Sequence, residues 1–176
     1  GGMGCSYVLD LCEELRRCAP AGFTAYVLAG RNARLMEELR RRYGDDARIQ
    51  PVGFTRQVAL YMRAADVLLS KPGGLSSTEA AAANVPLVHI MAIPGCETRN
   101  AAFFSSRGMS VRAANAREAV QAAGMLVENP EAAERMRRMQ RQYVPPRAAE
   151  RILLDIAAYC GAPCGLPDAP PRAQSV

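Results

Sequence analysis

The chain has 176 residues, enough for one compact domain and too few for two of ordinary size. Hydrophobic residues make up 49% and charged residues 22%, which is ordinary globular usage and excludes extensive disorder, collagen-like repeats and a coiled coil. The net charge of +5 comes from arginines interleaved with acidic residues, and aromatic residues are only 6%, so the composition argues against a nucleic-acid binder.

Predicted helices and strands alternate along most of the chain. Apolar periodicity and breakers predict, in order, a helix over 6–18, a strand over 23–29, a helix over 31–43, a strand over 48–54, a helix over 58–64, a strand over 66–70, a helix over 75–83, a strand over 86–91, a helix over 97–107 and a short strand over 109–112. Three helices follow, over 117–128, 131–142 and 147–159. The segment FTAYVLA at 23–29 is apolar throughout and is predicted to be a buried strand.

Strands that alternate with helices predict parallel pairing through right-handed crossovers, hence a Rossmann-like, doubly wound α/β domain over residues 1–159. Residues 160–176 are rich in Pro and Gly and are predicted to form a disordered tail. Ligands of such sheets bind beyond the carboxyl ends of the strands. Four unusual loops follow predicted strands or open predicted helices, at 1–4, 30–32, 71–77 and 94–100.

The sequence SKPGGLSST leaves a predicted strand, turns on Gly73 and Gly74, and opens a helix. Free amides at a helix start bind anions, glycines let the backbone approach a phosphate, and Ser76 or Ser77 can add hydroxyl donors. An ordinary Gly-Gly turn with a Ser cap is the alternative. Lys71 either neutralises phosphate or is a solvated charge, and the order of residues is not that of a Walker A motif.

Glu79 lies a turn further along the same predicted helix. A carboxylate there can accept hydrogen bonds from both hydroxyls of a ribose, or it can simply complement the helix dipole. Gly2 and Gly4 resemble a second phosphate-approach loop, although a short Gly cluster at a chain end is also typical of a cloning remnant.

Glu97 and Asn100 are predicted in the first turn of the helix that follows PGCETRN. They can bind sugar hydroxyls or merely cap the helix. His89 lies in an apolar strand and is predicted to be a core residue with a satisfied ring rather than a catalytic one. The arginines of 40–42 and 135–141 are read as solvated helix faces rather than a lipid-binding surface.

No apolar run reaches the roughly 18–20 residues of a membrane span, and the N-terminus lacks the pattern of a secretory signal. We therefore expect a cytoplasmic protein with free thiols rather than disulfides. The six cysteines include no C-x-x-C pair and there is one histidine, so no metal site is expected. Peripheral attachment to an anionic inner membrane face stays open.

Taken together, the loop sequences resemble the C-terminal, nucleotide-sugar-binding half of GT-B glycosyltransferases, in the family of monogalactosyldiacylglycerol synthases and processive diacylglycerol glucosyltransferases. The resemblance rests on GGMG at 1–4, AGRN at 29–32, VGF at 52–54, ADVLLSKPGGL at 65–75 with Glu79, and PGCETRNAAFF at 94–104. It extends from Gly1 to the helix ending near Tyr159.

The resemblance implies a UDP-sugar donor substrate and no other cofactor. The turn at Gly73 and Gly74 and the N-terminal glycines would flank the diphosphate, Glu79 would hold the ribose, and the main chain at Phe54 would read the uracil edge. Arg31 belongs to the same nucleotide site through the AGRN motif. Glu97 and Asn100 would face the donor sugar, in a G-Q-E-x-x-N pattern where Cys96 replaces the usual glutamine.

The implied activity is hexosyl transfer to a lipid such as diacylglycerol, with the acceptor site and the general base supplied by an N-terminal half. The chain starts at a Gly-rich loop that normally follows the first strand, so the sheet is expected to lack that strand. A fragment is one reading. The others are a non-catalytic nucleotide-binding subunit, the donor subunit of a split N-acetylglucosaminyltransferase, and a UDP-sugar epimerase. No catalytic residue is assigned.

Overall fold

The structure is a computed structural model that describes residues 5–19, 22–145 and 147–161. The chain divides into two compact units, Gly1–Val144 and Pro145–Val176. The helices of the first unit are α1 (Cys5–Cys18), α2 (Ala33–Tyr43), α3 (Val58–Ala64), α4 (Gly74–Ala83), α5 (Cys96–Ser106), α6 (Ala116–Glu128) and α7 (Pro130–Tyr143). Its strands are β1 (Ala25–Gly30), β2 (Ile49–Gly53), β3 (Leu68–Ser70), β4 (Leu87–His89) and β5 (Val111–Arg112). Each corresponds to a predicted element, with its ends shifted by at most two residues.

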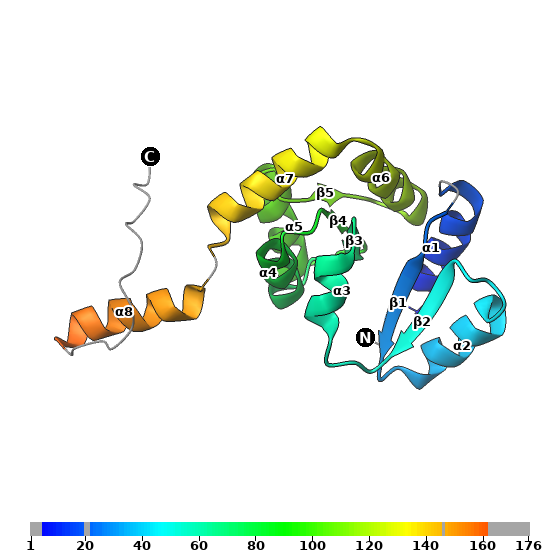
Figure 1. Cartoon of the computed structure of the whole chain (residues 1–176), viewed down its shortest axis with the longest axis horizontal. Helices are drawn as coiled ribbons and strands as arrows, with labels where there is room; N and C mark the ends of the chain where they lie inside the picture. Colours follow the sequence, from blue (N-terminus) through cyan, green and yellow to red (C-terminus); the bar gives the residue numbers. More distant parts are fainter. Residues whose placement is uncertain (1–4, 20–21, 146, 162–176) are drawn as a thin grey trace. The chain divides into compact units, whose positions relative to one another are not determined.

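The strands of the first unit form two parallel sheets, β1–β2 and β3–β4–β5, which confirms the predicted α/β class. Figure 1 shows β1 and β2 side by side, with α2 beside them, and the second sheet among α3 to α7. No ladder joins β1 to β3 in the described residues. Ser70, His89 and Arg112 lie opposite one another in the register, so β3, β4 and β5 end at the same level.

Helix α1 contributes to two hydrophobic cores, one for each sheet. Leu9 and Cys12 pack with α2, β1 and β2, whereas Leu11 packs with the strands and helices around β4. Leu15 contacts both cores. The apolar spacing of this helix, which predicts one wide buried stripe, therefore serves two clusters at once. Burial raises the pKa of the Cys12 thiol to about 12, so this cysteine acts as a core hydrophobe.

Strand β1 differs from the sequence prediction in its burial. Ala29 is buried against the α1–α2 side, but Tyr26 is 57% exposed and Leu28 is 40% exposed. The Tyr26 side chain meets the ring of Tyr61 on α3, with 5.5 Å between ring centres. The prediction of a buried strand at 23–29 is therefore wrong for one of its two faces, because α3 contacts Tyr26 there but leaves Tyr26 and Leu28 largely exposed.

Helix α7 closes the amino ends of β4 and β5. The fully buried Gln140 donates from Nε2 to the carbonyl oxygens of Val85, at 2.9 Å, and Met109, at 3.1 Å, just before each strand begins. Met136 lies against the amide of Leu87, with its sulfur 3.1 Å from that nitrogen. Helix α7 thus covers the edge of the sheet where β4 and β5 begin. The candidate loops lie at the opposite edge, where β3, β4 and β5 end.

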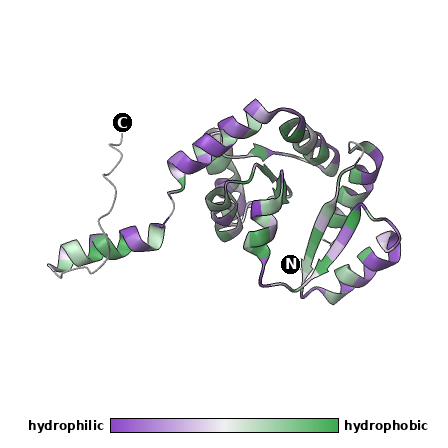
Figure 2. Cartoon of the chain, viewed as in Figure 1, coloured by the Kyte–Doolittle hydropathy of each residue, from purple (hydrophilic) through white to green (hydrophobic). Residues whose placement is uncertain are grey.

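The second unit contains α8 (Ala148–Cys160), which has no buried residue. Its apolar side chains Ile152, Leu153 and Ile156 are all more than half exposed. Figure 2 colours much of α8 as hydrophobic. Among the described residues, no helix combines the length and the apolar character needed to cross a membrane. The predicted tail lies almost entirely outside the described residues, and the predicted domain of 1–159 stays a prediction.

We predict that Gln140→Leu lowers the free energy of unfolding by about 1–3 kcal/mol, because two buried carbonyl groups lose their donor. Gln142→Leu, on an exposed position of the same helix, is the matched control and should change stability by less than about 0.5 kcal/mol. Urea unfolding of both variants tests this. Equal midpoints for the two would show that Gln140 does not hold α7 to the strands.

Candidate nucleotide-binding site

The first turn of α4 is an uncapped helix start. Strand β3 ends at Ser70, and Gly73 takes the N-cap position with extended backbone, φ −68° and ψ 142°. No side chain caps the helix. The amides of its first turn have no acceptor within the helix either, so they are available to an anion, which the helix dipole also favours.

The two glycines of this turn are not required by the packing of the described chain. Neither has a positive φ, and a Cβ built on Gly73 or Gly74 would meet nothing closer than 3.9 Å or 3.8 Å, respectively. An alanine would therefore fit at both positions, and at Gly74, inside the helix, it would be the better helix former. The glycines leave the backbone bare toward the outside of the turn, which favours the phosphate reading over an ordinary turn.

The side chains that follow the turn divide between the surface and the core. The Ser76 hydroxyl is the atom nearest to a Cβ built on Gly73, so it lies beside the turn. Ser77 is fully buried and its Oγ lies 3.0 Å from Nε2 of His89, so this predicted phosphate donor faces the core instead. Glu79 is exposed and has no hydrogen bond or ion pair to any other described residue.

His89 connects α4 to the strand edge. Its ring is 2% exposed, with Nε2 at the Ser77 hydroxyl and Nδ1 3.1 Å from Oγ of Ser110. The ring packs edge-on against Phe104, with 5.6 Å between centres. Burial, and to a lesser degree the Arg112 charge, lower the pKa of His89 to about 4. The prediction of a core histidine with both ring nitrogens satisfied is confirmed.

The loop before α5 is tied directly to the Gly-Gly turn. Asn100 donates from Nδ2 to the carbonyl oxygen of Pro72 at 2.9 Å. Nζ of Lys71 lies 3.3 Å from Oε1 of Glu97, and the other oxygen of that carboxylate accepts from the amide of Ile93 at 2.8 Å. The structure thus brings four predicted residues together, Gly73, Gly74, Glu97 and Asn100. The sequence shows Lys71 as a charge next to glycines, but it does not show that Lys71 pairs with Glu97.

Gly95 makes this second loop possible. Its φ of +106° is a conformation that residues with a side chain rarely adopt, and α5 begins at the next residue. The turn points Glu97 back over its own loop, where it accepts from Ile93. Glu97 therefore acts as a local cap in this structure, as the alternative reading of the sequence allowed, and also pairs with Lys71.

Arg31 and Phe54 form a separate pair at the ends of β1 and β2. The guanidinium of Arg31 stacks over the Phe54 ring, with 4.6 Å from its central carbon to the ring centre, and Phe54 is 59% exposed. Gly30, with φ +60°, turns the chain between β1 and α2. An exposed aromatic and a planar cation at strand ends are suited to a flat base. Gly2 and Gly4 lie outside the described residues.

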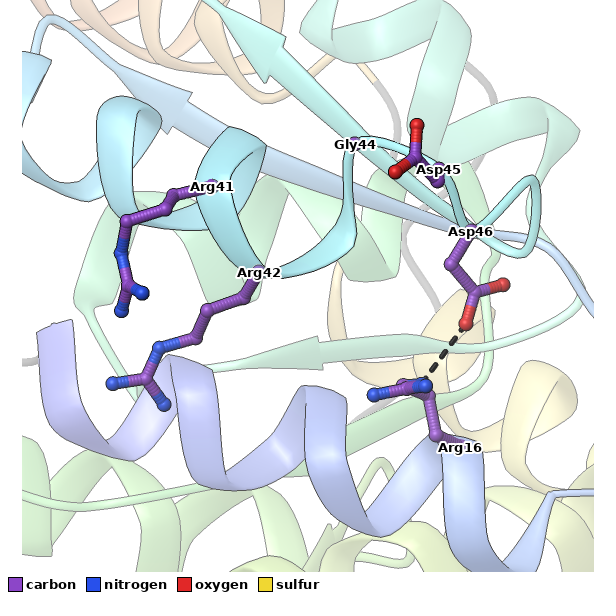
Figure 3. Close-up of a pocket in the computed structure, with 6 residues that line it drawn as sticks. All are labelled: Arg16, Arg41, Arg42, Gly44, Asp45 and Asp46. Atoms are coloured by element: carbon purple, nitrogen blue, oxygen red, sulfur yellow. Dashed lines mark ion pairs between the residues drawn. The ribbon is translucent and has the colours of Figure 1, made fainter.

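A hollow of about 270 Å³ lies at the amino-terminal edge of the β1–β2 sheet (Figure 3). It is lined by Arg16, Arg41, Arg42, Gly44, Asp45 and Asp46. The turn between α2 and β2 precedes its strand, so this hollow lies at amino ends, where doubly wound sheets do not bind ligands. Its arginines are also internally neutralised. Arg16 lies 2.9 Å from Asp46, and Arg41 and Arg42 both pair with Glu38.

The thiols in the described residues, those of Cys12, Cys18, Cys96 and Cys160, are free, which confirms that prediction for them. Cys96 is exposed at the start of α5 and stands one residue before Glu97. It occupies the position where the resemblance expects a glutamine amide.

No protein-family model matches the chain. In sequence the chain is 31% identical over 121 residues to the processive diacylglycerol β-glucosyltransferase of Staphylococcus carnosus, an alignment that covers 66% of this chain and 31% of the relative. It is 28% identical over 150 residues to the enzyme of the same name from Bacillus subtilis, covering 85% of this chain and 39% of that relative. The chain therefore spans less than two fifths of the length of these relatives.

The fold is similar to two solved structures, one named for a UDP-sugar and one solved with UDP. A putative UDP-N-acetylglucosamine 2-epimerase from Listeria monocytogenes has a TM-score of 0.71 at 17% identity, over 91% of this chain and 42% of that chain. HepE of Anabaena, solved in complex with UDP, has a TM-score of 0.62 at 19% identity, over 87% of this chain and 44% of that chain. At these identities the similarity establishes the fold.

We predict that His89 stays neutral in the folded chain down to about pH 5. It is the single histidine, so one Hε1 ring signal is expected in the NMR spectrum, and it needs no residue assignment. The signal should titrate with a midpoint near the lowered pKa of about 4, well below the ordinary value of about 6.5.

The same shift has a consequence for stability. Between about pH 6.5 and pH 4 the unfolded chain binds a proton on His89 that the folded chain does not, so this contribution to stability falls as the pH falls through that window. A titration midpoint near 6.5 in the folded protein would contradict the buried hydrogen-bonded arrangement.

Proposed function

Because the chain belongs to the GT-B glycosyltransferases, in the family of the processive diacylglycerol β-glucosyltransferases, we propose that it binds the UDP part of a UDP-sugar donor. The proposed overall reaction is transfer of a hexose to a lipid acceptor such as diacylglycerol, in glycolipid synthesis. The acceptor site and the general base belong, in this proposal, to a part of the enzyme or a partner subunit outside this chain. We propose that the present chain is located in the cytoplasm, at the inner face of a membrane.

One observation carries the nucleotide proposal: the uncapped start of α4, with two glycines that the described chain does not need. A nucleoside diphosphate is the ligand class that such a turn fits, since its oxygens accept from several bare amides at once. The Ser76 hydroxyl beside the turn can add a further donor. We leave Ser77 out of the ligand set because its hydroxyl is bonded to His89.

Glu79 is proposed to hold the ribose. Glu79 is four residues after Leu75, whose amide belongs to the first turn of α4. The two residues therefore lie on the same face of the helix, one turn apart. A carboxylate with no described partner, one turn beyond a diphosphate site, can accept from both hydroxyls of a ribose. Phe54 and Arg31 are proposed to meet the uracil, Gly2 and Gly4 to approach the diphosphate from the other side, and Glu97 and Asn100 to face the sugar.

The chemistry proposed for these residues is stabilisation of the leaving group. As the bond from the sugar to the diphosphate breaks, negative charge grows on the diphosphate oxygens. Fixed amide dipoles at the start of α4 then interact more strongly with the transition state than with the bound donor, and this difference accelerates the reaction. The proposed reaction needs the donor and the lipid acceptor as substrates and no cofactor.

We predict that Gly74→Ala weakens UDP binding at least about tenfold while the melting temperature stays the same or rises. The new methyl group fits the chain itself but occupies the space of the approaching phosphate, and a lost charge-assisted hydrogen bond is worth about 1.5–3 kcal/mol. Gly124→Ala is the matched control, since Gly124 is also helical and open and lies on α6. Calorimetric titration with UDP measures both. Equal affinity in the two variants would place the nucleotide elsewhere.

We predict that Glu79→Gln weakens UDP binding by roughly tenfold or more through the ribose hydroxyls. The diagnostic comparison is with 2′-deoxy-UDP. In the parent protein the deoxy ligand should bind more weakly than UDP, whereas in Glu79→Gln the two should bind within about twofold of each other. Glu131→Gln, an exposed carboxylate on α7, controls for the loss of a negative charge. An undiminished preference for UDP in the Glu79 variant would remove Glu79 from the site.

A further inference from the structure

The ion pair between Lys71 and Glu97 joins two loops that both belong to the candidate site. Lys71 stands two residues before the N-cap Gly73, and Glu97 stands at the start of α5. Nζ and Oε1 are 3.3 Å apart, and both side chains keep contact with solvent, with 36% of Lys71 and 19% of Glu97 exposed. Lys71 is the single lysine of the sequence.

The rest of the junction does not depend on this ion pair. Asn100 already fixes the α5 side to the Pro72 carbonyl, and the second carboxylate oxygen of Glu97 is held by the amide of Ile93. A solvent-accessible ion pair contributes only about 0–1 kcal/mol. The loops can therefore stay together when Lys71 leaves its partner, and a ligand with more than one negative charge is a stronger partner than one carboxylate.

We propose that Lys71 exchanges partners when the donor binds: it pairs with Glu97 in the empty site and with the diphosphate in the occupied site. The inference rests on the proposed binding of a diphosphate at the Gly-Gly turn and assigns a residue to it. The exchange also frees Oε1 of Glu97, the oxygen that pairs with Lys71 in the empty site, and this oxygen can then accept from a hydroxyl of the donor sugar. Glu97 thus competes with a bare diphosphate for Lys71.

This competition gives the two charges opposite effects on UDP, which has the diphosphate but no sugar. Removing Glu97 leaves Lys71 unpaired and should improve UDP binding. Removing Lys71 should weaken it. A pair that only holds the loops in shape would give effects of the same sign, because either change breaks the same ion pair.

The test is calorimetric titration of UDP into four proteins: the parent, Glu97→Gln, Lys71→Met and the double variant. We expect Glu97→Gln to tighten UDP binding by about threefold to tenfold and Lys71→Met to weaken it by about tenfold. The double variant should match Lys71→Met, since Glu97 has nothing to compete for once the lysine is gone. Uridine, which has no phosphate, should bind all four alike.

Two controls separate this exchange from general effects. Lys71→Arg keeps the cation and should retain UDP binding within a fewfold of the parent, and Glu131→Gln should leave it unchanged. With lysine labelled at the ε-carbon alone, the single lysine gives one side-chain signal, which should shift when UDP is added and stay in place when uridine is added.

The possible failures are distinguishable. If the parent does not bind UDP, the proposed function fails. If it binds UDP and Gly74→Ala weakens the binding, but Glu97→Gln and Lys71→Met both weaken it or both leave it unchanged, the partner exchange alone is overturned.

Discussion

The backbone amides at the start of α4 are the feature on which the candidate site depends. A helix start without a side-chain cap leaves donors that must find an acceptor outside the helix, and the dipole concentrates positive potential at the same point. Such a start is useful only if it is held in place. His89 holds it from the strand edge through Ser77, and Asn100 holds the preceding carbonyl from α5. The side chains of Ser77 and Asn100 thus fix the main chain of the candidate site.

The fold supports this arrangement by closing one edge of the β3–β4–β5 sheet and leaving the other to loops. Gln140 and Met136 of α7 occupy the amino ends of β4 and β5, while the in-register ends at Ser70, His89 and Arg112 lead into the candidate loops. Helix α1 contributes to the cores of both sheets, so the β1–β2 sheet and the β3–β5 sheet belong to one compact unit without a ladder between them. The pocket among Arg16, Arg41 and Arg42 lies instead at the amino end of a strand. It is basic and hollow, but its charges are neutralised by neighbouring carboxylates.

Much of this could be predicted from the sequence, because the signals are local. Apolar periodicity and Pro or Gly breakers located every helix and strand of the described chain within two residues, and a lone histidine in an apolar strand indicated a satisfied core ring. The misses concern contacts between distant segments. Nothing near Ser77 in the sequence shows that its hydroxyl faces His89, twelve residues on, and nothing near Lys71 shows that Glu97 lies beside it. The exposure of Tyr26 and Leu28 was missed for the same reason, since an apolar run does not reveal which of its faces lacks a partner.

The most direct test of the central claim is an amide-resolved NMR titration of the chain with UDP. The account predicts that the largest shift changes fall on the amides of Gly74, Leu75 and Ser76, with smaller ones near Phe54. Saturable binding of UDP that leaves those three amides unmoved, and shifts instead the residues around Arg16 and Asp46, would contradict it.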